Sequence, residues 1–222
     1  MTIWFLDQSA NDVPPGNDWL GGAELSALAR FTIPKRRADW RLGRWTAKAA
    51  ISRLLKLPQS AGALAEIEVR PAPSGAPEVF LHGRRAPVNI STSHSHGMGF
   101  CSVADCGIDV GCDVERVLPC MASRLSDYFT EAEQDVIRGI AEGDRDSAAT
   151  LLWSAKESAF KLLRCGLRSD PRALSVQPRM PFYRSAAWSR FAIEPDLGGT
   201  QGWWREAGGF VWAVLASHPS GA

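Results

Sequence analysis

The sequence predicts an α+β protein made of two lobes of similar plan, each with one long helix followed by short strands. Two observations support this prediction. A helix-rich stretch precedes short strand-like runs between Gly/Pro/Ala-rich loops, and this order occurs twice along the 222 residues. A chain of this length also fits two small lobes packed together. We place the boundary after Cys106, which divides the chain into residues 1–106 and 107–222.

The first lobe contains the strongest helical stretch, residues 38–57, which is rich in Arg, Ala, Leu and Trp and stops at Pro58. Pro and Gly mark loops after it, and short runs of β-branched and apolar residues mark strands. The strands expected in this lobe are 67–70, 88–91 and 99–104.

The second lobe opens with a strand over 108–115, in which apolar side chains alternate with acidic ones. The apolar positions are Ile108, Val110, Cys112 and Val114, and the acidic ones are Asp109, Asp113 and Glu115. Further on we expect helices over 123–142, broken at Thr130, and over 147–163, then a last strand over 209–216. We find no residue-level repeat between the lobes, so their similarity rests on the order of elements.

Composition and charge exclude several classes of protein. The net charge is +1, from 25 basic and 24 acidic residues, which gives no general attraction for nucleic acid or an anionic membrane. The N-terminus lacks a basic region followed by an apolar run, and no stretch is long and apolar enough to span a membrane. Five cysteines without a CxxC pair indicate reduced thiols. We therefore expect a cytoplasmic protein.

Two acids in the strand, Asp113 and Glu115, lie two residues apart and so share one face. Carboxylates this close repel each other, and a divalent cation relieves the repulsion. Such hard oxygen donors suit Mg²⁺, which takes its other ligands from water and substrate phosphates. The alternative is a solvated acidic strand edge, so this pair alone is weak evidence for a metal site.

A second group lies on the expected helix 147–163, where Trp153, Glu157 and Lys161 follow one another at steps of four. The simplest interpretation is an ordinary surface Glu–Lys pair. Because Trp, Ala and Phe surround it, we expect the pair to be partly buried, where two charges need a function. Glu157 could complete a metal site or act as a base, and the ammonium group of Lys161 could neutralise a phosphate.

A row of cations follows one face of the first helix, at steps of four, three and four residues. Its members are Arg37, Arg41, Arg44 and Lys48. With no acid between them, these cations repel one another unless an anion is bound. A solvated cationic face is the alternative, but the purity of the row favours a phosphate-binding surface.

These residues resemble the signature motifs of the 4′-phosphopantetheinyl transferase superfamily. Residues 111–115, G-C-D-V-E, are similar to its pattern G-x-D-x-E. Residues 153–161, W-S-A-K-E-S-A-F-K, are similar to W-[ST]-x-K-E-[AS]-x-x-K, and both patterns match at every defined position. Their joint occurrence is far more specific than either motif alone. The length resembles the Sfp-type branch, in which one chain forms two lobes in a pseudo-two-fold arrangement, rather than the half-length holo-acyl-carrier-protein synthases.

The resemblance implies a magnesium-dependent enzyme that transfers 4′-phosphopantetheine from coenzyme A to a serine of an apo acyl or peptidyl carrier protein. It implies Asp113, Glu115 and Glu157 as metal ligands, and Glu157 and Lys161 as catalytic residues. Whether Glu157 is a ligand or a base stays open. The residues that it assigns to coenzyme A are Arg44, Lys48, Ser93, His94, Lys156 and Lys161.

The resemblance covers residues 37–161 and implies further assignments. Residues 89–95 resemble N-x-S-H-S with two residues inserted, and residues 129–133 resemble F-[ST]-x-x-E, which places Glu133 near the metal. The two-lobed length implies a monomer. Basic residues that could face an acidic carrier protein are Arg116, Arg124 and Arg138.

Other readings of the same residues remain. A magnesium-dependent nuclease could use the acids, but it predicts a nucleic-acid affinity that a net charge of +1 does not favour. A non-catalytic protein that binds coenzyme A or carriers is less favoured, because all the motif acids and lysines are present. We expect Asp109 to be a neighbour of the metal rather than a ligand. A zinc site would need an unfamiliar spacing of His94, His96, Cys101 and Cys106.

Overall fold

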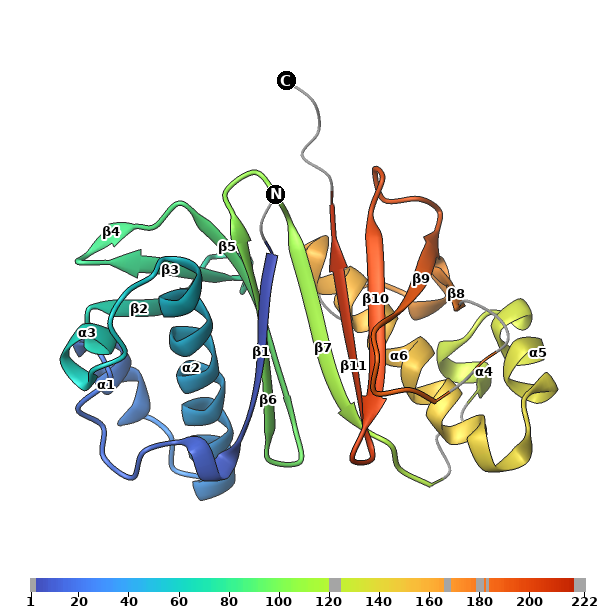
Figure 1. Cartoon of the computed structure of the whole chain (residues 1–222), viewed down its shortest axis with the longest axis horizontal. Coiled ribbons are helices and arrows are strands. Elements are labelled where there is room, and N and C mark those ends of the chain that lie inside the picture. Colours follow the sequence, from blue (N-terminus) through green and yellow to red (C-terminus); the bar gives the residue numbers. More distant parts are fainter. Residues whose placement is uncertain (1–2, 120–124, 166–168, 179–181, 183, 218–222) are drawn as a thin grey trace. The chain divides into compact units, whose positions relative to one another are not determined.

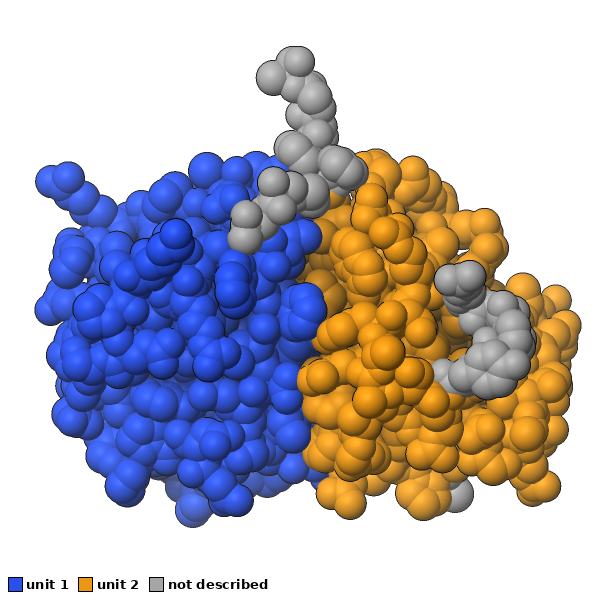
Figure 2. All heavy atoms as spheres, in the orientation of Figure 1, with its two compact units in different colours: residues 1–109 blue, residues 110–222 orange. Residues whose placement is uncertain are grey.

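In a computed structural model of the chain, the structure describes residues 3–119, 125–165, 169–178, 182 and 184–217. The chain divides into two compact units, residues 1–109 and 110–222, which Figure 2 shows in different colours. Each unit has its own hydrophobic core.

Unit 1 contains an antiparallel sheet in the order β1-β6-β5 and a second one in the order β2-β3-β4. Its strands are β1 (Ile3–Ser9), β2 (Ile67–Pro71), β3 (Pro77–Leu81), β4 (Arg84–Arg85), β5 (Val88–Ser95) and β6 (Met98–Asp105). Its helices are α1 (Gly22–Leu28), α2 (Pro34–Leu54) and α3 (Ala61–Ala65), with a 3-10 turn at Ala10–Asp12. The long helix α2 packs on β6 and β1 (Figure 1).

Helix α2 is the helix expected over 38–57, but it begins at Pro34 and ends at Leu54. Proline suits a first turn, because its fixed φ is already helical and its missing N–H would have no partner there. The end is set by Lys56, whose φ of 55° is left-handed, and the Leu57 amide donates to the Ser52 carbonyl. The chain therefore leaves the helix before Pro58.

Unit 2 has one five-stranded antiparallel sheet in the order β7-β11-β10-β9-β8. Its strands are β7 (Val110–Arg116), β8 (Ser175–Pro178), β9 (Ser189–Glu194), β10 (Gln201–Ala207) and β11 (Phe210–Ala216). Its helices are α4 (Leu125–Tyr128), α5 (Glu131–Gly139) and α6 (Arg145–Leu162), with 3-10 turns at Glu142–Asp144 and Pro171–Ala173. The long helix α6 packs on β7 and β11 (Figure 1).

The predicted break at Thr130 is confirmed, because Thr130 is the N-cap of α5. Its hydroxyl accepts from the Glu133 amide at 3.3 Å, while its own amide donates to the Glu133 carboxylate at 2.8 Å. This reciprocal pair is a capping box, which starts a new helix. Residues 123 and 124, where the expected helical stretch begins, lie outside the described residues.

The predicted α+β class is confirmed, since each unit packs one long helix on an antiparallel sheet. The two helices also share sequence, and the prediction that no residue-level repeat exists is wrong. Residues 45–57, W-T-A-K-A-A-I-S-R-L-L-K-L, align with residues 153–165, W-S-A-K-E-S-A-F-K-L-L-R-C. Like α2, α6 is followed two residues after its end by a basic residue in the left-handed region, Arg164 with φ 56°.

In the described part of the chain, no helix combines the length and the apolar character needed to cross a membrane.

Candidate active site

Gly111 on β7 lets the strand lie directly against α6. A Cβ atom at this position would come within 1.8 Å of the Ser158 carbonyl oxygen, so only glycine fits. Asp113 lies two residues further along β7, on the same face as Gly111. Because α6 packs so closely on this face, only 2% of the surface of Asp113 is exposed. The G-x-D spacing of the motif thus sets an acid under the helix.

Asp113 is held by two side chains from α6. The ammonium nitrogen of Lys161 lies 2.7 Å from Asp113 Oδ1, and the hydroxyl of Ser154 donates to Oδ2 at 2.9 Å. Lys161 also donates to the Cys112 carbonyl at 3.1 Å. Burial disfavours a charged lysine, but the Asp113 carboxylate outweighs it and raises the pKa of Lys161. Lys161 therefore stays protonated while keeping a quarter of its side chain exposed.

Glu157 lies on the same side of α6 and differs from Asp113 in its environment. Within the described residues, no hydrogen-bond donor reaches its buried Oε1 atom. Burial raises the pKa of Glu157, the negative charge of Asp113 raises it further, and Lys161 opposes both. The structure thus brings two carboxylates and one ammonium group together, with an unsatisfied oxygen on the second carboxylate.

This donor set fits a magnesium ion. The orphaned oxygen of Glu157, beside a second carboxylate, is the kind of hard donor that Mg²⁺ binds, and this ion needs only one or two carboxylates when phosphates supply other ligands. Glu115 lies two residues beyond Asp113 on β7 and is half-buried. Among the described residues, no group of three or more His, Cys, Asp or Glu side chains is arranged as a metal site.

Lys156 does not fit its predicted role of binding coenzyme A. Its side chain is fully buried, and its ammonium nitrogen lies 2.7 Å from Glu133 Oε2. It also donates to three backbone carbonyls, those of Tyr128, Pro171 and Leu174. A lysine has three N–H donors, so none is left for a ligand. Burial lowers the pKa of Lys156, although Glu133 opposes this.

The same pair changes the expectation for Glu133, which the resemblance places near the metal. Glu133 is buried with 1% of its surface exposed, and its oxygens accept from the Thr130 and Val176 amides and from Lys156. Both carboxylate oxygens are used inside unit 2. Glu133 therefore holds α5, α6 and β8 together rather than facing a ligand.

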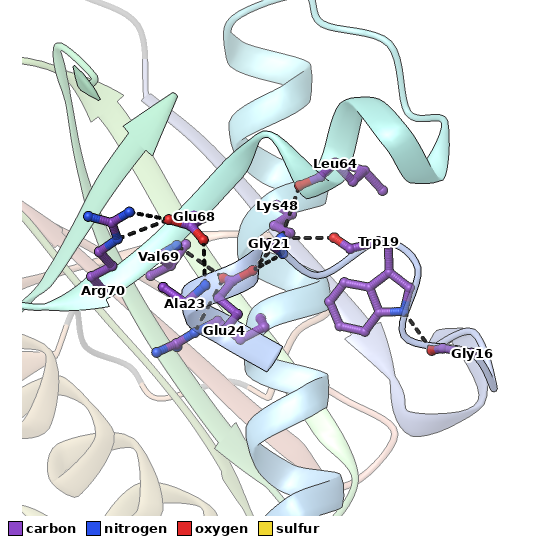
Figure 3. A network of polar contacts seen from close by, with 11 residues as sticks. Gly16, Trp19, Gly21, Ala23, Glu24, Lys48, Leu64, Glu68, Val69 and Arg70 are labelled. Carbon is purple, nitrogen blue, oxygen red and sulfur yellow. Dashed lines mark hydrogen bonds and ion pairs between the residues drawn. The ribbon is translucent and has the colours of Figure 1, made fainter. Parts of the chain in front are cut away.

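Lys48, the last cation of the predicted row, is also unsuited to a phosphate. It is fully buried, 2.5 Å from Glu24 Oε2, and it donates to the carbonyls of Trp19 and Leu64 (Figure 3). Burial lowers its pKa, and Glu24 opposes this. The row was predicted to lack an acid, but Glu24 reaches it from α1. We therefore leave Lys48 out of the proposed site.

Other members of the row are partly satisfied by the protein. Arg41 donates to the backbone carbonyls of Pro14 and Gly16, the latter at 2.7 Å. Arg44 lies 3.8 Å from Glu24 and stacks on the Trp40 ring, with its guanidinium carbon 4.9 Å from the ring centroid. Burial lowers the pKa of Arg44, with Glu24 opposing. With 16% of its side chain exposed, Arg44 remains able to meet an anion.

The predicted pair Ser93 and His94 lies on β5, opposite Phe100 and Gly99 of β6. Ser93 is half-buried, and His94 is exposed. The His94 ring lies against α2, since a Cβ atom on Gly43 would be 4.0 Å from its Cδ2 atom. The structure thus places His94 beside the helix that carries Arg44, as two residues assigned to one ligand require.

Glu24 is the residue that sequence reasoning missed. It is 2% exposed, and its carboxylate accepts from the Gly21 and Val69 amides besides pairing with Lys48 (Figure 3). A signal existed in the repeat W-[ST]-A-K at 45–48 and 153–156. Once Lys156 is known to pair with a glutamate, the repeat predicts a glutamate for Lys48.

Fold and site together define an α+β protein with an acid–lysine centre suited to phosphates and a divalent cation. Residues 109–190 match the model of the 4′-phosphopantetheinyl transferase superfamily. This segment contains the acids of β7 and the whole of α6. This match confirms the resemblance to the superfamily seen in the sequence for this segment.

Solved structures similar to part of the chain are holo-acyl-carrier-protein synthases. The one from Bacillus anthracis, in complex with coenzyme A (3′,5′-ADP), is 22% identical, with 46% of this chain and 91% of that chain covered and a TM-score of 0.39. The one from Plasmodium yoelii is 19% identical, with 46% and 90% covered and a TM-score of 0.38. The Helicobacter pylori one, with coenzyme A, is 18% identical, with 47% and 99% covered and a TM-score of 0.33. No curated protein matches the sequence.

Proposed function

We propose that this protein transfers 4′-phosphopantetheine from coenzyme A to a serine hydroxyl of an apo carrier protein, which releases adenosine 3′,5′-bisphosphate. The observation that supports this most is the centre of Asp113, Glu157 and Lys161, which lies inside the segment that matches the superfamily. The two-unit plan supports the Sfp-type branch.

Asp113 and Glu157 are the residues proposed to hold Mg²⁺, with Glu115 as a third ligand. When bound, the ion would neutralise charge on the coenzyme A diphosphate. The serine oxygen forms a bond to the phosphorus that carries the pantetheine arm, and the bond from that phosphorus to the adenosine bisphosphate oxygen breaks. Lys161 stays protonated because of Asp113, and it offsets negative charge on the transferring phosphate.

Glu157 has two roles open to it, metal ligand and general base. Its raised pKa suits a group that accepts the proton of the serine hydroxyl near neutral pH. Its orphaned oxygen suits a ligand. Glu157→Gln distinguishes them, because losing a ligand raises the Mg²⁺ concentration for half-maximal rate, whereas losing a base lowers kcat even at saturating Mg²⁺.

The anionic groups of coenzyme A are proposed to bind Arg44, Ser93 and His94. Arg44 offers a partly exposed guanidinium group, and His94 lies against the same helix. The carrier is proposed to be an acyl or peptidyl carrier protein of a fatty acid, polyketide, nonribosomal peptide or siderophore pathway. Arg116 and Arg138 are basic residues available to an acidic carrier, and Arg124 lies outside the described residues.

The test is mass spectrometry of apo acyl and peptidyl carrier proteins incubated with this protein, coenzyme A and Mg²⁺. We expect the mass of one phosphopantetheine to be added, and the gain to disappear when Mg²⁺ is chelated. Asp113→Asn should abolish transfer, while Asp135→Asn, at an exposed pair with Arg138, should leave it intact. No gain on any carrier, or full activity of Asp113→Asn, would refute the proposal. Size-exclusion chromatography should show a monomer.

A further inference from the structure

A glutamate near the start of a short helix clamps the long helix of each unit. In unit 1, Glu24 accepts from the Gly21 amide at 3.1 Å and from the Val69 amide of β2 at 3.1 Å, and it pairs with Lys48 of α2 at 2.5 Å (Figure 3). One carboxylate thus joins α1, β2 and α2. Glu24 is buried, so its charge depends on these partners.

Glu133 makes the same contacts in unit 2. It accepts from the Thr130 amide at 2.8 Å and from the Val176 amide of β8 at 2.7 Å, and it pairs with Lys156 of α6 at 2.7 Å. In both units the first amide lies three residues before the glutamate, and the second belongs to a valine in the first strand after the long helix.

The two lysines also use equivalent carbonyls. In each unit, the lysine donates to two backbone carbonyls at equivalent positions. One lies five residues before the glutamate of that unit, and the other lies five residues before the valine that donates to this glutamate. The first pair is Trp19 at 2.8 Å and Tyr128 at 3.1 Å. The second pair is Leu64 at 2.9 Å and Pro171 at 2.8 Å. Because the donors and acceptors agree, the two ion pairs belong to the same hydrogen-bonding arrangement, which occurs once in each unit.

The residues that follow the clamped lysines differ. In unit 2 the next residue is Glu157, and Lys161 lies five positions after the lysine. In unit 1 these positions hold Ala49 and Arg53, so α2 lacks the Glu–Lys pair that α6 carries there. Glu24 instead lies 3.8 Å from Arg44, one turn before Lys48 on α2. The Glu24–Lys48 and Glu133–Lys156 pairs therefore have different charged residues beside them on α2 and α6.

We propose that Glu133 and Glu24 are positioning residues with separate effects, which rests on the proposed function above. By anchoring Lys156, Glu133 fixes the rotation of α6 and so the placement of Glu157 and Lys161 against Asp113. By anchoring Lys48 and facing Arg44, Glu24 fixes the cation that meets coenzyme A. Neither glutamate touches substrate.

The experiment compares Glu133→Gln with Glu24→Gln, which make the same chemical change in equivalent surroundings. Carrier modification is measured against coenzyme A concentration at saturating Mg²⁺, and coenzyme A affinity is measured by calorimetry. We expect Glu133→Gln to lower kcat about tenfold with affinity within about twofold of wild type. We expect Glu24→Gln to weaken coenzyme A binding about fivefold with kcat within about twofold.

Matched controls are Asp135→Asn on α5 and Asp39→Asn on α2, which remove exposed ion pairs from the same regions and should change neither parameter. Because a lone buried ammonium can prevent folding, the neutral double variants Glu133→Gln/Lys156→Met and Glu24→Gln/Lys48→Met are made as well. Circular dichroism is used to check that each variant is folded at the assay temperature.

The outcomes separate this inference from the proposed function. If both clamp variants are folded and shift kcat and affinity in the same proportion, or shift neither, the separate positioning roles are wrong. If wild type modifies no carrier, the proposed function fails. The calorimetric comparison then still decides the role of Glu24, since unchanged affinity in folded Glu24→Gln contradicts it and a fivefold loss supports it.

Discussion

Replacing Gly111 by alanine tests the contact between β7 and α6 on which the acid centre depends. The added Cβ atom would lie 1.8 Å from the Ser158 carbonyl oxygen and 2.8 Å from the Leu162 amide nitrogen. Both are backbone atoms, so no change of rotamer relieves the clash. Since ordinary contact begins at 3.4 Å, strand and helix must separate by about 1.6 Å.

The cost can be estimated from this geometry. Overpacking a core with side chains that can move costs about 1–3 kcal/mol, and a clash with a helix backbone lies above that range, at about 3–5 kcal/mol. For a chain of this size, 1 kcal/mol shifts the melting temperature by about 2–4 °C, so we expect a fall of about 10 °C. Transfer should fall as well, because Asp113 moves away from Glu157 and Lys161.

The assay is thermal unfolding followed by circular dichroism, with two comparison variants. Gly99→Ala in β6 would place its Cβ atom 2.6 Å from Thr46 Oγ1, a side-chain atom that can move, so a smaller loss is expected. Gly139→Ala, at the end of α5, meets nothing within 4 Å and should be neutral or slightly stabilising. If Gly111→Ala and Gly139→Ala have the same melting temperature, the close packing of β7 on α6 is refuted.

Two further predictions concern unit 2. The raised pKa of Glu157 means that its contribution to stability is complete below about pH 4.5 and is lost as the pH rises through the raised value. In the absence of metal, the melting temperature of Glu157→Gln minus that of wild type should therefore increase as the pH rises towards neutral. A difference that stays constant with pH would contradict this. Thr130→Ala removes the N-cap of α5 and should cost about 1 kcal/mol in urea unfolding. Ser60→Ala is its control, because Ser60 caps only the short α3 through a 3.4 Å bond, and an equal loss in both would contradict the capping role.

Much of the fold could be predicted from local pattern. Both long helices, the strands β2, β5, β6, β7 and β11, and the break at Thr130 were all expected. The ends of α2 were not, because helix ends depend on caps rather than on periodicity. The proline at position 34 and the left-handed Lys56 decide them.

The acids of the site could also be predicted, since motif spacing fixes which side chains share a face. Spacing placed Glu157 and Lys161 on one face of α6, and the resemblance to the family motifs grouped them with Asp113, which the structure brings to Lys161. The burial of Asp113 under α6 also explains why the motif needs glycine at position 111.

The environment of the cations depends on tertiary contacts that spacing does not reveal. Spacing placed Lys48 on one face with Arg37, Arg41 and Arg44, and the family resemblance assigned Lys156 to coenzyme A. Neither could show that Glu24 and Glu133, on separate short helices, pair with these lysines, or that backbone carbonyls accept their remaining ammonium hydrogens.

By itself, the sequence determined the α+β class, the two long helices, the strands β2, β5, β6, β7 and β11, and the acid–lysine motif, because these depend on spacing within single helices and strands. Only the tertiary structure decided which charged residues are buried in clamps and which remain accessible. Burial depends on what distant segments of the chain place against a helix, and a pairing between remote residues leaves no periodic trace in either segment.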